Sequence, residues 1–567
     1  MKRIILDVTL CVKSPFLFPE MAAGSFGIDR IALRNEDGCP IIPQEQVRGV
    51  LLHACADAAL AMQKKHALRF SIFGQASADA RPREGQKAQD TESFAPCRGR
   101  ILFSDLVMQD ATEEARAVRV QIDDELGAAK DGQLMFAELV APTGADVTFA
   151  GQAVLMASDT EANEWLALLR AAASWVSAIG AMKSAGFGEV VSFSLAEKTR
   201  VPMAPARGTV RVGRQGYLLR FDRPFLVDAR RAADNVYVGQ AEVPGGVIKG
   251  ALARKAELCG LADRLGPAIS ALAISHARLG GPVLPLSMVV SPDNQRVGDA
   301  LSGLPGQGAL IEDKPALWAP DWKPGTDDRV RAALGLEQAP MLRRSLRTHV
   351  AIEAGTAGAE TGKLFVIDAV DPADRDWVFC VDYDRVLDEQ ARGLLAALLE
   401  SGLDGLGRTG ASATISPSVA PDLPKVVPII GTQDQFAVVL ESDAVMATPE
   451  DGEDAFDAYA LWWARVLPGA RLVTFAAQQR LAGGYLGRRY GPAGSYEPFW
   501  VTQAGSVFRL QGDLEQALTV LTEQGLPAPK IDGKPGTWQN CPYLPENGFG
   551  AIRCDHDGRL CSEVHHG

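Results

Sequence analysis

The sequence predicts an α+β protein made of repeated modules, and three observations support this prediction. Short strands alternate with amphipathic helices along the 567 residues. Helix starts marked by a proline, with a basic residue and a glycine shortly after it, occur more than once. Glycine-rich turns also recur, one in each repeat. Because a chain of this length exceeds one hydrophobic core, we expect three or four domains.

The first module comprises residues 1–200. We expect a strand at about 3–12, after which Pro43 opens a helix whose apolar residues follow helical spacing. Beyond further strands, a second helix is expected at about 161–179, with Gly180 as its C-cap. This order of strand, helix, strands, helix and strand is typical of a ferredoxin-like (RRM-like) sandwich.

A proline-rich break at 201–208 precedes the second module, residues 208–425, which repeats the plan. Its strand GYLLRFDRPFLV leads to the helix start VPGGVIKG, and a later helix is expected at about 387–399. Residues 426–567 carry the strand FAVVLES and the helix AFDAYALWWARVL. We assign them as a third ferredoxin-like segment, either an independent domain or the C-terminal lobe of the second half of the chain.

Composition restricts the class of protein. A mean hydropathy of +0.00 is that of an ordinary globular chain, and no apolar run reaches the ~20 residues of a membrane-spanning helix. The start, with Asp7 in an alternating pattern, does not resemble a signal peptide. Nine scattered cysteines without a CxxC pair predict reduced thiols in the cytoplasm. A net charge of −13 argues against a free-standing nucleic-acid binder, but it leaves room for a subunit with a local basic groove.

Three glycine turns stand out, KSAGFGEV (183–190), GLGRTGAS (405–412) and NGFGAI (547–552). GLGRTG has the letters of a dinucleotide fingerprint, but it follows a helix where that fingerprint opens one, which disfavours a nucleotide-dependent oxidoreductase. Plain C-cap turns are one alternative. The other is RNA binding, because glycines leave backbone N–H groups open to phosphate. The candidate RNA-binding residues of these turns are Lys183, Ser184, Gly186, Gly188, Arg408, Thr409, Gly548 and Gly550.

These motifs resemble the RAMP superfamily of CRISPR-associated proteins. Residues 1–200 are similar to the backbone subunit of type III effectors in the stretches FGIDRIALRNEDGCPIIPQEQVRG, RGRILFSDLVM, VRVQIDDELGAAKDGQLMFAELV and AMKSAGFGEVVSF. Residues 208–567 are similar to the larger RAMP subunit of type III-D systems in VPGGVIKGALARK, ISHARLGGPVLPLSM, RTHVAIEAGTAGAETGKLF, GRTGAS, AGSVFRL and ENGFGAI.

The resemblance implies tandem RAMP modules with inserted loops and β-hairpin thumbs. It also implies three kinds of partner, namely a guide RNA (crRNA), the complementary target RNA and other type III effector subunits, with no membrane. The second half would cap the 5′ end of the guide. At the two helix starts it assigns guide contacts to Arg48, Gly49, Lys249 and Gly250. The family has a glycine after the first proline, where this chain has Gln44.

The resemblance also implies a cutting residue, an aspartate in the loop after the first strand. The matching residue is Asp29 in GSFGIDRIAL, fourteen positions before Pro43. A 2′-hydroxyl that attacks its own phosphate needs a proton acceptor, and a carboxylate can be that acceptor or hold Mg²⁺ or another divalent cation. Spacing alone favours a solvated loop carboxylate or a local cap at Asp29, and the resemblance reverses this preference. Glu36 and Asp37 flank Gly38 and are expected to form a turn.

In the second module the corresponding loop lacks the Gly-x-Asp pattern, so we expect no cutting there. Arg230 and Arg231 fit contact with an RNA backbone, or an exposed basic pair. The segment RRSLRTHVAIE resembles a thumb, and it places Arg347 and His349 near phosphates; a charged edge strand is the alternative. His349 as an acid–base catalyst is disfavoured, since no second histidine is near in sequence. The corresponding stretch of the first module, ATEEARAVRVQIDD, is more acidic.

The tail contains possible zinc ligands, but their spacing fits no familiar closed site, so we expect a polar tail without metal. They are Cys554, His556, Cys561, His565 and His566. The leading hypothesis is a guide-binding subunit that cuts target RNA through Asp29. A non-catalytic scaffold of the same complex and a guide-precursor processing ribonuclease are the alternatives. Few histidines and several modules count against the latter.

Overall fold

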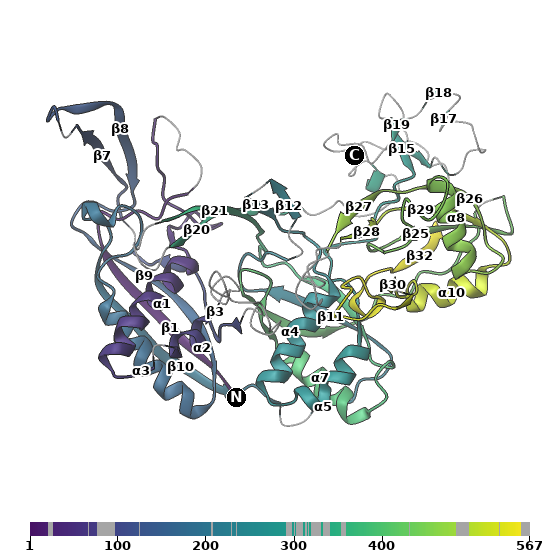
Figure 1. Ribbon diagram of the computed structural model, residues 1–567, viewed down its shortest axis with the longest axis horizontal. Coiled ribbons are helices and arrows are strands. Elements are labelled where there is room, and N and C mark those ends of the chain that lie inside the picture. Colours follow the sequence, from purple (N-terminus) through teal and green to yellow (C-terminus); the bar gives the residue numbers. More distant parts are fainter. Residues whose placement is uncertain are drawn as a thin grey trace, which may run out of the picture.

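The computed structural model shows three main antiparallel sheets that lie one after another along the long axis of the molecule (Figure 1). None of the helices it describes is long and apolar enough to cross a membrane. It describes residues 1–567 except 21–26, 66, 76–96, 111, 124, 206–207, 228–229, 234, 291–296, 300, 302–309, 312–313, 316, 319–329, 333–340, 353–358, 430, 484–497, 532 and 557–567.

The first sheet has the order β10-β1-β9-β6-β2, with β5 also paired to β9. Alternate residues of β1, from Ile4 to Val12, are fully buried, because one face of the strand is covered by α1 and α3. The elements are β1 (Lys2–Lys13), β2 (Ile41–Ile42), α1 (Gln44–Ala61), β5 (Ile101–Phe103), β6 (Leu106–Met108), β9 (Asp146–Ala157), α3 (Asp159–Trp175) and β10 (Glu189–Pro202).

The second sheet has the order β14-β22-β11-β24-β23 and its own core, in which Tyr217, Phe379 and Trp377 are buried. Helices α4, α5 and α7 contribute to that core. The elements are β11 (Arg214–Phe221), α4 (Gly245–Leu258), α5 (Ala262–Ala271), β14 (Ala273–Ile274), β22 (Trp377–Asp382), α7 (Glu389–Glu400), β23 (Leu403–Leu406) and β24 (Ala411–Ser418).

The third sheet has the order β26-β29-β25-β32, and its core contains Trp463 and Phe508. Its elements are β25 (Gln435–Leu440), α8 (Ala455–Val466), β26 (Arg471–Ala476), β29 (Val507–Gln511), α10 (Glu515–Gln524) and β32 (Ile552–His556). In all three sheets the strand that comes first in the chain lies between the last strand and a later central strand: β1 between β10 and β9, β11 between β24 and β22, and β25 between β32 and β29. The predicted α+β class is therefore confirmed, and the three main sheets are antiparallel.

Two inserted hairpins leave the first two sheets at the same point of the element order. β7 (Ala115–Ile122) and β8 (Ala129–Leu139) form a two-stranded ribbon that projects from the first sheet, at the upper left of Figure 1. β20 (Arg344–Ile352) and β21 (Ala359–Val370) leave the second sheet and join β13 and β12 in a four-stranded sheet. The last two are β12 (Arg230–Ala233) and β13 (Val236–Val238).

The remaining elements are short and connect or flank the sheets. They are α2 (Leu68–Phe73), β3 (Gly74–Gln75), β4 (Cys97–Arg98), η3 (Lys183–Ala185), β15 (Met288–Val290), β16 (Val297–Asp299), β17 (Leu310–Ile311), β18 (Lys314–Pro315), β19 (Leu317–Trp318), β27 (Gln479–Ala482), β28 (Phe499–Thr502), β30 (Lys530–Ile531), β31 (Lys534–Pro535) and η5 (Pro545–Asn547).

The helix predictions need one correction. α3 ends at Trp175 with Val176 as its C-cap, so Gly180 is not the cap. Gly180 lies in the following loop with φ +97°, where a Cβ would approach the Leu17 carbonyl to 2.8 Å. Glycine is needed there for close packing of two loops rather than for ending the helix.

Candidate nucleic-acid interface

A cavity of 660 Å³ lies at the junction of the first two sheets. Its walls come from the start of α1, the glycine turn 405–410 and the inner face of the β20/β21 hairpin. We call it the junction groove. It brings together four of the predicted RNA-binding residues from three separate motifs, namely Arg48, His349, Arg408 and Thr409.

Two arginines supply the positive charge of the junction groove. Arg48 is exposed on α1 and donates to the Phe73 carbonyl at 2.5 Å. Arg408 is exposed on the glycine turn, and its guanidinium lies 4.4 Å from the centre of the Tyr237 ring. Neither forms an ion pair with any residue that the structure describes. Both guanidinium groups therefore keep donors for a phosphate.

Aromatic rings accompany these cations. His349 stacks on Phe365 across the β20/β21 pair, with ring centres 4.9 Å apart and planes 7° apart. Phe365 in turn meets the edge of Tyr237, at 6.1 Å. Burial lowers the pKa of His349, so the ring is neutral at pH 7. Cations interleaved with aromatic rings are typical of surfaces that bind single-stranded nucleic acid.

Phe365 and Tyr237 are not among the site residues predicted from the sequence. Phe365 could have been found from the register of the hairpin, in which it is paired with His349. Tyr237 had no local signal, because β13 reaches β21 as a parallel neighbour from more than a hundred residues away in the chain.

One wall of the junction groove is a polar network that joins the first two modules. Arg347 is buried and donates to both carboxylate oxygens of Asp105, the longer bond being 2.9 Å. Burial alone would raise the pKa of Asp105, but the guanidinium of Arg347 outweighs it and the pKa is lowered. Gln44 donates from Nε2 to the Thr409 carbonyl at 2.9 Å and accepts from Arg223 at 3.0 Å. Arg347 is thus engaged inside the protein.

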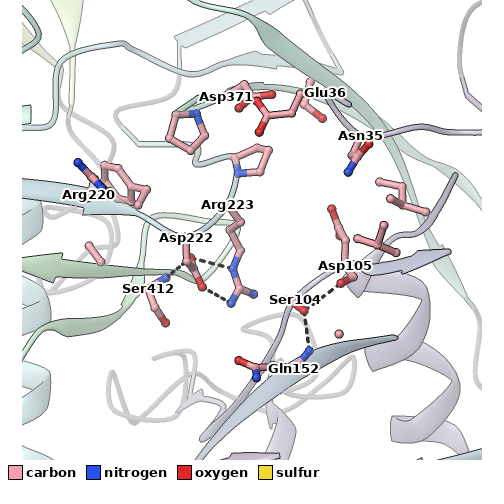
Figure 2. A pocket seen from close by; sticks show the side chains of 18 of the residues that line it. Asn35, Glu36, Ser104, Asp105, Gln152, Arg220, Asp222, Arg223, Asp371 and Ser412 are labelled. Carbon is pink, nitrogen blue, oxygen red and sulfur yellow. Dashed lines mark hydrogen bonds and ion pairs between the residues drawn. The ribbon is translucent and has the colours of Figure 1, made fainter. Parts of the chain in front are cut away.

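A larger cavity of 980 Å³ lies on the other side of this network (Figure 2). Most of its arginines already have acidic partners: for example, Arg223 pairs with Asp222, and Arg220 pairs with Asp376 at 2.8 Å. At its rim, burial and the neighbouring Asp371 carboxylate raise the pKa of Glu36. Its charges compensate one another, so it is a poorer phosphate site than the junction groove.

Asp29 lies elsewhere, at the base of the β7/β8 hairpin, and lines neither cavity. Its Oδ2 accepts from the Phe136 N–H at 2.8 Å, and its own N–H donates to the Phe136 carbonyl at 2.9 Å. The carboxylate is exposed, and Oδ1 takes part in no hydrogen bond between described residues. The backbone of β8 therefore orients one oxygen and leaves the other toward solvent.

The first glycine turn flanks the same hairpin base. Lys183 and Ser184 are exposed in η3, while Phe187 packs against Ala137 of β8. Gly188, at φ +74°, has no room for a Cβ, which would lie 1.9 Å from the Ile179 carbonyl; Gly186 faces open space. The turn and Asp29 together form a second exposed polar surface, separate from the junction groove.

The second helix start and the third glycine turn pack against each other. Lys249 is buried, and it donates to the carbonyls of Ser270 (2.9 Å) and Glu546 (3.3 Å); burial lowers its pKa to about 8. A Cβ on Gly548 would lie 2.5 Å from the His276 ring, and Gly550 packs on Leu526. These residues hold the third segment on α4.

The other predicted residues lie at the surface or outside the described part of the chain. Gly49 and Gly250 both border open space. The backbone of Arg230 and Arg231 forms β12, but their side chains lie outside the described part of the structure. So does the tail from 557 to 567, with Cys561, His565 and His566.

No three His, Cys, Asp or Glu side chains among the described residues gather closely enough to hold a metal ion. Asp29 nevertheless fits the way in which Mg²⁺ is commonly held at RNA, by one carboxylate oxygen together with phosphate oxygens of the substrate, because its Oδ1 remains available.

The comparisons with known proteins do not assign this chain to a family. No protein-family model and no curated protein matches the chain. Among solved structures, it is similar to a chain of the cryo-EM structure of the type III-B Cmr-beta bound to cognate target RNA. The identity is 10%, the TM-score is 0.24, and the match covers 34% of this chain and 96% of that chain. With so low a TM-score, the function has to be argued from the site itself.

Proposed function

We propose that the protein is a guide-RNA-binding subunit of a type III CRISPR effector complex and that its first module cleaves the paired target RNA through Asp29. The junction groove carries this proposal, because it collects Arg48, His349, Arg408 and Thr409 from motifs far apart in the sequence. A groove of this kind gives a chain of net charge −13 a local surface that attracts phosphates.

The arrangement of strands supports the finer assignment. In each of the three sheets the strands follow the order expected for a ferredoxin-like module, and inserted hairpins occupy equivalent places in the first two. We therefore assign tandem RAMP modules at 1–200 and 208–425, with 426–567 as a third ferredoxin-like lobe. The partners would be crRNA, target RNA and further subunits of the effector.

In the proposed reaction, the 2′-hydroxyl oxygen of one target nucleotide attacks its own phosphate, and the bond from phosphorus to the 5′ oxygen breaks. The products are a 2′,3′-cyclic phosphate and a 5′-hydroxyl, which takes its proton from water. Asp29 Oδ1 accepts the proton of the 2′-hydroxyl while the Phe136 N–H holds Oδ2. In the alternative role, Asp29 Oδ1 would help to hold a divalent cation together with phosphate oxygens, which would stabilise negative charge on the phosphate, and the 2′-hydroxyl proton would pass to water.

The test is cleavage of target RNA by the guide-loaded complex in magnesium, with Asp29→Asn as the main variant. Asparagine keeps an oxygen for the Phe136 N–H but cannot take the proton. We expect cleavage to fall by about 10²-fold or more while guide and target remain bound. Asp131→Asn, an exposed aspartate on the same hairpin, should cleave as wild type. Unchanged cleavage by Asp29→Asn would remove Asp29 from the site.

The alternative is a scaffold that binds the same RNAs without cutting them. The net charge of −13, and Gln44 where the resembled family has a glycine, favour it. The same experiment decides: a wild-type complex that binds target tightly and leaves it intact, with and without magnesium, would establish the scaffold.

A further inference from the structure

The junction groove has a feature that phosphate binding alone does not use. The stacked rings of His349 and Phe365 line it, and Phe365 is only half buried. Phosphate contact requires cations and N–H groups, and Arg48, Arg408 and the glycine turn supply them. The aromatic pair adds an apolar flat surface beside those cations.

Two polar atoms at this groove also lack partners inside the protein. His349 Nε2 and Thr409 Oγ1 are both covered by protein, and neither has a hydrogen bond in the part of the chain described. An unpaired polar atom that is covered by protein lowers the stability of the folded state. Such atoms are rare in folded proteins, and a ligand that pairs with them after a small side-chain rotation would remove that cost.

We infer that the junction groove holds one unpaired RNA nucleotide, with its base stacked on the His349–Phe365 pair and its phosphate between Arg48 and Arg408. This inference rests on the proposed function and adds to it a base-binding subsite. Thr409 Oγ1 is the group that meets the edge of the base, and His349 Nε2, which lies in the plane of the stacked imidazole, is the group that meets the sugar or phosphate. The groove volume of 660 Å³ is ample for a nucleotide and too small for a duplex.

The experiment uses the purified full chain and a single-stranded RNA in which 2-aminopurine replaces one base at a time. Stacking on the ring pair should quench the fluorescence of the analogue at one position of the bound RNA and not at its neighbours. Placing an abasic nucleotide at that position should weaken binding about five- to hundredfold, as expected for one stacked base. This arm requires no change to the protein.

Variants of the hairpin give the second arm. Phe365→Ala should abolish the position-specific quench and weaken binding by the same factor as the abasic nucleotide, while Phe365→Tyr should retain both. Leu364→Ala is the matched control, because Leu364 is exposed on the opposite face of the same strand. Unfolding midpoints of all three variants show whether each is folded.

RNA that binds tightly with no quenched position and no effect of the abasic nucleotide would overturn the base subsite and leave guide binding in place. A wild-type chain that binds no RNA would overturn the proposed function as well.

Discussion

The two inserted hairpins leave their sheets at the same point, yet they have different surroundings. The β7/β8 ribbon carries exposed Val118, Val120 and Ile122 on one face, and it projects from the first module. The β20/β21 hairpin belongs to a four-stranded sheet and rests on the first module through Arg347. The second hairpin has a neighbouring module within the chain to pack on. A hairpin therefore becomes part of a binding groove only where another module supplies the facing wall.

The same contrast divides the basic residues of β20. Residues of one face, such as Arg347 and His349, point to the neighbouring module and the groove, whereas Leu346 and Val350 of the other face are exposed. A strand alternates its side chains, so Arg347 and His349, two residues apart, share one face of β20 and meet different surroundings along it. Arg347 forms an ion pair with Asp105 inside the protein, whereas His349 lines the junction groove.

The largest expected effect comes from breaking the contact that distinguishes the hairpins. Arg347→Met leaves the partly buried Asp105 carboxylate without its ion-pair partner, which should destabilise the protein by up to about 3–5 kcal/mol. Denaturant unfolding followed by tryptophan fluorescence measures it. Arg116→Met, an exposed arginine of β7, should stay within about 0.5 kcal/mol of wild type. Equal effects at both sites would show that β20 is not anchored through Arg347.

A smaller effect is expected at the other end of the same wall. Gln44→Gly removes the amide that bridges the Thr409 carbonyl and Arg223, which should destabilise the junction by about 1–3 kcal/mol. Hydrogen exchange should then become faster in the turn 405–410. Gln46→Gly, in the same turn of α1, is the control, because it carries the same helix penalty of glycine but leaves the Gln44 bridge in place. If the two variants show the same rate of hydrogen exchange in the turn 405–410, the Gln44 bridge does not stabilise the junction.

The smallest effect is expected on the projecting ribbon. Val118→Thr keeps the branched shape and adds a hydroxyl to a side chain that is 58% exposed, so thermal stability should change by less than about 0.5 kcal/mol. The corresponding change at a buried strand position, Val8→Thr, should destabilise clearly. A large loss at Val118 would mean that the ribbon packs on another surface in solution.

The sequence predicted local structure well where the signal was local. The buried alternation of β1 and the start of α1 after Pro43 both came from periodicity and proline chemistry. The junction could not be predicted, because it depends on pairs such as Gln44 with Thr409, which are 365 residues apart. Lys249 shows the same limit. Its charge indicated RNA contact, but the third segment covers α4 and directs the ammonium to the Ser270 and Glu546 carbonyls.

The wall of the junction groove is built by both halves of one polypeptide, with the amide of Gln44 on one side and the Thr409 carbonyl on the other. Two separate proteins would have to find each other before such a groove existed, at a rate set by their cellular amounts. Covalent linkage makes the encounter intramolecular, with an effective concentration in the millimolar range for a short connection. The two walls of the groove are therefore always present in a one-to-one ratio, whatever the level of expression.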